Sequence, residues 1–133
     1  MLTVGELLMT KGPDVVVAPP AATAFEAAKL MAQAGTGSVI VREGGRAIGI
    51  FTERDLLRKV VAARKDPQTV TLAEVMSAPV ASCRLADRLD DCGHLMSKSH
   101  IRHLAVIGDD ALVGLISLRD VLTAQASWDR AAV

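Results

Sequence analysis

The spacing of apolar and polar residues along the chain predicts one series of helices and strands, and this series occurs twice. It consists of a short helical turn, an extended apolar segment, an amphipathic helix, two strands and a last helix. In the first half, the predicted ranges are residues 3–6, 14–18, 23–34, 37–42, 46–51 and 52–63. In the second half, they are residues 71–74, 80–83, 87–98, 103–107, 112–116 and 117–126.

A repeated heptapeptide aligns the two halves. Residues 49–55 read GIFTERD, and residues 114–120, 65 positions later, read GLISLRD. Upstream, the segment that begins at Val4 aligns with the one that begins at Leu72, at an offset of 68. A short loop insertion explains this slip of three positions. Two copies of one unit of about 65 residues therefore account for nearly the whole chain.

Local signals mark the ends of these elements. Thr3-x-x-Glu6 and Thr71-x-x-Glu74 have the spacing of capping boxes, and Asp87 is predicted to start the second long helix. The sequences at 43–45 and 108–110 predict tight hairpin turns.

The order of elements predicts the fold class α+β, in which each repeat is a small three-stranded sheet with helices. A unit of this size buries little apolar surface by itself, so we expect the two to pack pseudo-symmetrically, sheet against sheet. The predicted division is 1–66 for the first repeat, 67–126 for the second and 127–133 for a C-terminal tail. Asp66-Pro67 is predicted to link the repeats.

Composition narrows the classes of function. Fifteen basic residues balance fifteen acidic ones, and the only aromatic residues are two Phe and one Trp. Nucleic-acid binding is disfavoured, because neither a basic excess nor stacking rings are available. No apolar run is long enough to cross a bilayer, and no secretory signal is recognised. Cys83 and Cys92 are interpreted as free thiols, and we expect a cytoplasmic protein.

The sequence offers no set of residues for catalysis or metal binding. Cys92, His94, His100 and His103 match no common zinc spacing, and no nucleophile, base and orienting group can be assembled. We therefore expect no enzyme, no catalytic residue and no metal site.

Two hydroxyl–x–x–Asp segments carry the candidate chemistry. Thr52 with Asp55, and Ser117 with Asp120, lie where a strand ends and a helix begins. One interpretation is helix capping. The other is a ligand site, where the hydroxyl and the helix N-terminus face a phosphate and the carboxylate accepts ribose hydroxyls. The two interpretations are compatible.

Basic residues lie close to both segments. Arg54 and Arg119 stand in the first helical turn, where a cation is unfavourable unless an anion compensates it. Arg102 and His103 begin a strand of the second repeat, where the first repeat has Gly37-Ser38.

Residues 1–126 resemble a pair of CBS domains, the tandem arrangement called a Bateman module. Residues 49–55, 114–120 and 101–106 carry the resemblance, although family members often have Pro where Ala105 stands. The resemblance implies an adenine nucleotide, AMP, ADP or ATP, in the cleft between the repeats. The ligand-binding residues that it implies are Thr52, Arg54, Asp55, Ser117, Arg119, Asp120, Arg102, His103, Val15, Val16, Val80 and Ala81.

The resemblance also implies a function. We expect a regulatory or sensor module that signals to an effector protein in trans and forms a homodimer through the last helix of each repeat. The alternative is a module for dimerisation or protein interaction that needs no ligand.

Two expectations follow from these motifs. Replacing Asp55 or Asp120 by Ala should weaken nucleotide binding and cost only about 1 kcal/mol of stability, the value of a cap. The Arg102-His103 pair should make one nucleotide site per chain tighter than the other.

Overall fold

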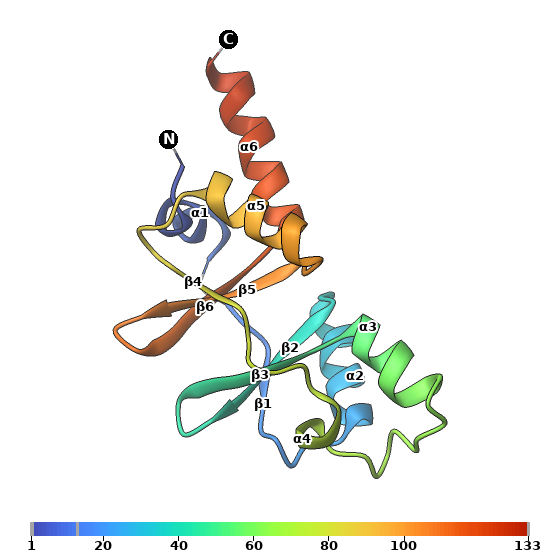
Figure 1. The fold of residues 1–133 in the computed structure, drawn as a ribbon. Coiled ribbons are helices and arrows are strands. Elements are labelled where there is room, and N and C mark those ends of the chain that lie inside the picture. Colours follow the sequence, from blue (N-terminus) through green and yellow to red (C-terminus); the bar gives the residue numbers. More distant parts are fainter. Residues whose placement is uncertain (1, 13, 133) are drawn as a thin grey trace. The chain divides into compact units, whose positions relative to one another are not determined.

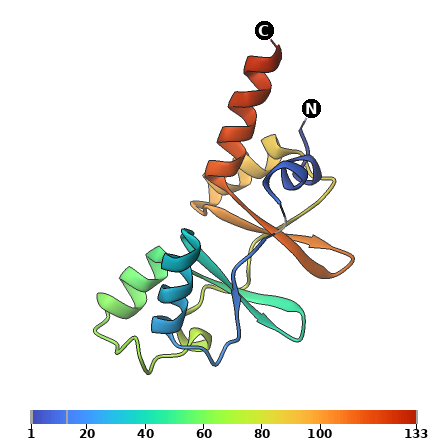
Figure 2. The ribbon, with the colours of Figure 1, turned by 180° about the vertical axis from the view of Figure 1, so that it is seen from behind.

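The computed structural model describes residues 2–12 and 14–132 and divides the chain into two compact units. Residues 15–80 form the continuous unit. Residues 1–14 and 81–133 together form the discontinuous unit, into which the continuous one is inserted along the sequence. Each unit contains one small sheet and its helices (Figures 1 and 2).

The continuous unit has a three-stranded sheet in the order β1-β2-β3. The pair β1/β2 is parallel and the pair β2/β3 is antiparallel, with a bulge between Val41 and Arg42. Its elements are β1 Val17–Ala18, α2 Ala24–Ala34, β2 Ser38–Glu43, β3 Arg46–Thr52, α3 Glu53–Asp55, the π-helix η1 Leu56–Val61 and α4 Leu72–Val75.

The discontinuous unit repeats this topology with the sheet β4-β5-β6. Its bulge lies between Val106 and Ile107, 65 positions after that of the other sheet. Its elements are α1 Val4–Lys11, β4 Ser82–Arg84, α5 Leu89–Ser99, β5 His103–Gly108, β6 Ala111–Ser117 and α6 Leu118–Ala132. The α+β fold class, with a three-stranded sheet in each repeat, is confirmed.

The two cores use equivalent helix positions. In α2 the buried residues are Ala24, Ala27 and Met31, and in α5 they are Leu89, Cys92 and Met96, each 65 positions later. This spacing places one face of each helix against its sheet. The sheets contribute fully buried β-branched and leucine side chains to the cores, among them Val39, Val41, Leu104 and Val106.

The short N-terminal helix packs against a distant part of the sequence. In α1, the amides of Val4 and Gly5 donate to Asp87 O (2.8 Å) and Leu85 O (2.9 Å). The equivalent helix of the continuous unit is α4, whose Leu72 amide donates to Ala22 O (2.8 Å). Asp66-Pro67, predicted as a linker, lies inside the continuous unit. The boundaries of the two compact units therefore differ from those of the predicted sequence repeats.

The hairpin turns agree with the prediction. Gly44 and Gly45 have φ values of 58° and 80°, and Asp109 and Asp110 have 49° and 62°. Two successive residues with positive φ give the turn whose twist suits two-residue hairpin loops. Aspartate tolerates this conformation better than most residues, so the second hairpin forms without glycine at these two positions.

Several predicted helix ends are confirmed and others are wrong. The Thr3 capping box is present, and Thr23 caps α2, which ends at the left-handed Gly35. At Thr71, however, the hydroxyl donates to the Glu74 carboxylate (3.1 Å) and caps no amide.

Asp87 does not start α5. Its carboxylate accepts a bond from the Arg84 amide (2.8 Å) and closes a turn, and the helix begins two residues later. The helix predicted at 52–63 is instead the three-residue α3 followed by η1. At the other end of the chain, α6 continues to Ala132, so the described part of the predicted tail is helical.

Candidate functional site

Both hydroxyl–x–x–Asp segments lie at the junction of a last strand with a helix. Thr52 ends β3 and its Oγ1 accepts a bond from the Asp55 amide (3.2 Å). Ser117 ends β6 and its Oγ accepts a bond from the Asp120 amide (3.0 Å). The capping interpretation is therefore confirmed in both repeats.

The first amide of each helix is also bonded within the protein. The Glu53 amide donates to Gly37 O (3.0 Å) and the Leu118 amide donates to Arg102 O (2.8 Å). These bonds tie each helix start to the residue just before the middle strand of its sheet. Among the first three amides of each helix, two are thus used internally, which limits how a phosphate could bind there.

The Asp55 carboxylate is buried, and both of its oxygens have partners. Its Oδ2 accepts bonds from the amide (3.0 Å) and the hydroxyl (3.2 Å) of Thr52. Its Oδ1 accepts a bond from Ser77 Oγ (2.9 Å) and lies 3.3 Å from Lys59 Nζ. Only 8% of the side chain is exposed. Asp55 therefore connects the start of α3 to the segment that follows α4.

The Asp120 carboxylate has a different environment. Its Oδ2 accepts bonds from the Ser117 amide (2.8 Å) and from Lys11 Nζ (2.6 Å), and 25% of the side chain is exposed. Lys11 Nζ also donates to Leu115 O (2.5 Å). Partial burial raises the pKa of Asp120, but the Lys11 ammonium and the bonds from Ser117 outweigh it, so the pKa lies below its usual value.

Lys11 is a member of this site that sequence reasoning missed. It is the last residue of α1 and lies 109 positions from Asp120 along the chain. No local signal pairs two residues at such a separation, and the repeat alignment places Pro79 at the equivalent position.

The basic pair of the second repeat lies next to Ser117. His103 is the first residue of β5 and pairs with Ser117 across the β5/β6 ladder. Arg102 precedes it, is exposed, and binds the start of α6 through its carbonyl. In the continuous unit, Ser38 occupies the place of His103 and pairs with Thr52. The structure thus brings Arg102, His103, Ser117 and Asp120 to one end of one sheet.

The remaining predicted ligand residues lie around these sheets. Arg54 and Arg119 are exposed in the first turns of their helices. Four further predicted ligand-binding residues, Val15, Val16, Val80 and Ala81, are half-buried. The carbonyls of Val16 and Ala81 accept bonds from the amides of Ile40 and Ala105 (2.9 Å each), so both positions extend an edge strand.

Two glycines in the repeated heptapeptide are explained by packing. A Cβ at Gly49 would lie 2.5 Å from Met76 Sδ and 3.0 Å from Ser77 O. A Cβ at Gly114 would lie 3.0 Å from Leu8 Cδ1. Met76 immediately follows α4, and Leu8, at the equivalent repeat position, lies within α1. Each glycine therefore makes room for the helix region that packs against its strand.

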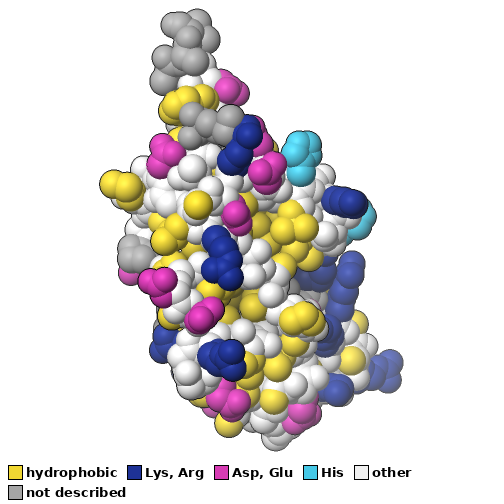
Figure 3. Space-filling view, turned by 60° about the vertical axis from the view of Figure 1, so that its left-hand side comes forward, with side chains coloured by type: hydrophobic (Ala, Val, Ile, Leu, Met, Phe, Trp, Pro, Cys, Tyr) yellow, Lys and Arg dark blue, Asp and Glu magenta, His cyan; other side chains and the backbone are white. Residues whose placement is uncertain are grey.

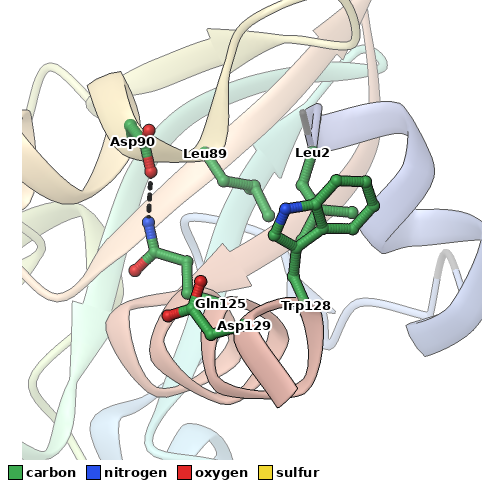
Figure 4. Close-up of a pocket in the computed structure, with 6 residues that line it drawn as sticks. All are labelled: Leu2, Leu89, Asp90, Gln125, Trp128 and Asp129. Atoms are coloured by element: carbon green, nitrogen blue, oxygen red, sulfur yellow. Dashed lines mark hydrogen bonds between the residues drawn. The ribbon is translucent and has the colours of Figure 1, made fainter. Parts of the chain in front are cut away.

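A separate cavity of about 590 Å³ lies in the discontinuous unit (Figure 4). It is lined by Leu2, Leu89, Asp90, Gln125, Trp128 and Asp129. The Gln125 amide donates to Asp90 Oδ1 (2.6 Å) and joins α6 to the start of α5. None of the predicted ligand-binding residues lines this cavity.

Both cysteines are buried and free, as predicted. Burial and the neighbouring Cys92 raise the pKa of Cys83 to about 12, so its thiol stays protonated at neutral pH and is a poor nucleophile. In residues 2–12 and 14–132, no group of three or more His, Cys, Asp or Glu side chains is placed to hold a metal ion. No helix in this part of the chain is long and apolar enough to cross a membrane.

Comparisons with known proteins agree with this architecture. The CBS domain family model matches residues 4–62 and again residues 72–127. An uncharacterized protein of Methanopyrus kandleri is 39% identical over 111 residues; the match covers 82% of this chain and only 57% of that protein.

Two solved structures are similar along nearly their full length. One is a putative signal-transduction protein with CBS domains from Burkholderia ambifaria, with 32% identity, a TM-score of 0.90 and coverage of 95% of both chains. The other is a CBS domain protein from Pyrobaculum aerophilum complexed with AMP, with 28% identity, a TM-score of 0.81 and coverage of 95% of this chain and 99% of that one. This chain therefore belongs to the CBS domain family and carries two copies of the domain in tandem.

Proposed function

We propose that this chain is a regulatory module, not an enzyme, that binds an adenosine-containing nucleotide such as AMP, ADP or ATP. The observation that carries the proposal is the group formed by Arg102, His103, Ser117 and Asp120 at one end of a sheet. It combines two basic side chains and a hydroxyl, which suit phosphate, with a partly exposed carboxylate, which suits ribose hydroxyls. The similar Pyrobaculum protein, complexed with AMP, supports the same ligand class.

The other predicted residues have proposed roles of the same kind. Thr52, Arg54 and Asp55 form the equivalent group of the continuous unit, and Arg119 adds a cation beside Asp120. Val15, Val16, Val80 and Ala81 are proposed to contact adenine, with aliphatic side chains in place of aromatic ones.

A thermal shift assay tests nucleotide binding. AMP, ADP and ATP should each be compared with the matching 2′,3′-dideoxynucleotide, because the proposed carboxylate contact needs the ribose hydroxyls. A ligand at about 100 times its dissociation constant adds about 2.7 kcal/mol of stability. The Asp120→Asn variant should lose the shift with AMP. Equal shifts with AMP in this variant and the wild type would contradict the proposed contact.

We also propose that the module acts on an effector protein in trans and associates with a second copy of itself. Leu57 and Val61 of η1 are 61% and 62% exposed, and Leu122 of α6 is 57% exposed. Hydrophobic side chains are visible at the surface in the space-filling view (Figure 3). Val60 and Val121, on the same helical segments, are fully buried and belong to the cores instead.

Light scattering tests the dimer. The wild type should have about twice the 14.0 kDa mass of one chain, and a Leu57→Asp/Val61→Asp variant should return to one chain. Met9→Asp, at an 88% exposed methionine elsewhere, is the control and should stay dimeric.

A module for dimerisation alone is the second candidate function. It is favoured by the Asp55 carboxylate, whose two oxygens are already used by Thr52, Ser77 and Lys59. Dimers with no thermal shift from any of the nucleotides would support it.

A further inference from the structure

Lys11 forms an ion pair with the Asp120 carboxylate, to which the proposed function assigns the ribose hydroxyls. Its ammonium lies 2.6 Å from Asp120 Oδ2 and 2.5 Å from Leu115 O. Only 28% of the Lys11 side chain is exposed. Because Lys11 is the last residue of α1, these two bonds fix the end of that helix against β6 and the start of α6.

The equivalent carboxylate of the continuous unit is held differently. Lys59 Nζ lies 3.3 Å from Asp55 Oδ1, and 42% of its side chain is exposed. Ser77 bonds the same oxygen, and Thr52 bonds the other one. Both Asp55 oxygens therefore keep a hydrogen-bond donor from their own unit even without Lys59.

Asp120, in contrast, has fewer known bonds. Those from the Ser117 amide and from Lys11 both go to its Oδ2. A pair of neighbouring hydroxyls that donates to both carboxylate oxygens would meet the Lys11 ammonium at Oδ2. The Ser117 amide can remain bonded there, but the ammonium and a ligand hydroxyl compete for the same lone pair.

We propose that Lys11 sets the affinity of the discontinuous unit for its ligand, because its ammonium competes with a vicinal diol for Asp120. The ligand class is a nucleotide with both ribose hydroxyls, and the proposal rests on the proposed function. A bound diol displaces the ammonium and releases the C-terminal end of α1 from β6. Ligand occupancy is thus converted into a change at one helix end.

Measuring the affinities of two ligands for the wild type and for a Lys11 variant isolates this competition. AMP and 2′,3′-dideoxy-AMP carry the same phosphate, so their affinity ratio reports the diol and cancels any effect of lost charge on phosphate binding. In Lys11→Met, calorimetry should show this ratio raised roughly three- to tenfold over the wild type, the range expected for a partly exposed charge-assisted bond. Lys11→Gln serves as a second variant of similar length.

The matched control is Lys59→Met, which removes the corresponding cation from the continuous unit and should leave the ratio unchanged. A ratio that is unchanged or lower in both Lys11 variants, while the wild type binds AMP, overturns the competition and leaves the proposed function standing. Failure of AMP to bind the wild type and the Lys11 variants overturns the proposed function and this inference with it.

Discussion

Asp55 and Asp120 occupy the same position in the two units, yet different parts of the chain neutralise them. In the continuous unit the cation is Lys59, one turn further along the same helical segment, and a serine adds a further bond. In the discontinuous unit the cation is Lys11, which comes from α1. The residue that aligns with Lys59 is Ala124. Both repeats thus have the carboxylate, but it is nearly buried and more extensively bonded in one unit and more exposed in the other.

Because of this difference, we expect substitutions in the Thr52–Asp55 and Ser117–Asp120 segments to have different effects. Both capped helices look alike in sequence, and both carboxylates accept a bond from the amide of the capping residue. The difference lies in exposure, 8% for the Asp55 side chain and 25% for that of Asp120. Substitutions made in pairs, one per unit, test this difference.

The largest expected effect is that of Asp55→Ala on stability. This change leaves the Thr52 amide, Ser77 and Lys59 without the nearly buried carboxylate that they share, which should cost about 3 kcal/mol. Asp120→Ala should cost about 1–2 kcal/mol, since its carboxylate is more exposed. The structure thus revises the sequence-based expectation of about 1 kcal/mol for Asp55. Urea denaturation followed by circular dichroism measures both, and equal losses would contradict the contrast.

The glycines of the repeated heptapeptide form the next pair. Gly49→Ala forces its methyl group against Met76 Sδ and the Ser77 carbonyl, and should cost about 2 kcal/mol. Gly114→Ala meets only the flexible end of Leu8 and should cost about 1 kcal/mol or less. The free energies of unfolding of the two variants provide the check. A larger loss at Gly114 would show that the packing argument is wrong.

Substitutions at the C-terminal ends of α2 and α5 should change stability in opposite directions. Gly35 and His100 occupy the same left-handed position, with φ of 66° and 56°. Gly35→Ala should destabilise by about 1 kcal/mol, and His100→Gly should stabilise by up to about 1 kcal/mol, because only glycine adopts this conformation without strain. Gly93→Ala, inside α5 with room for a methyl group, is the control for helix propensity and should stabilise. Thermal denaturation of all three variants tests the signs.

The smallest effect is the acid dependence of stability. The pKa of Asp120 lies below its usual value in the folded chain, so its ionised form stabilises the fold above about pH 4, and this contribution is lost as the pH falls further. The wild type should therefore lose stability more steeply than Asp120→Asn as the pH falls below about 4. Asp14→Asn, at an exposed position, controls for a general change in charge. Parallel curves of stability against pH for the wild type and Asp120→Asn would contradict this contribution of Asp120.

Much of the fold could be predicted because its signals are local. Helix α2 follows from apolar spacing, a threonine cap and a terminal glycine, and the hairpins follow from their turn residues. The capping of both hydroxyl–x–x–Asp helices was likewise visible in a four-residue window.

Two errors occur where another local bond replaces the expected cap. The Thr71 hydroxyl donates to the Glu74 carboxylate, and Asp87 closes a turn with Arg84 before α5 begins. The partner of Asp120 could not be predicted at all, because nothing near residue 11 indicates which sheet α1 completes.

The placement of α1 has a consequence for the order of folding during synthesis. Residues 15–80 can complete the continuous unit as soon as they are made. The helix α1, although synthesised before this unit, finds its partners β4 and β6 only after residue 117 has been added. Until then its apolar residues Val4, Leu7 and Leu8 have no core of their own. A helix made before the continuous unit is thus buried after it, and its hydrophobic stripe stays exposed in the nascent chain during that interval.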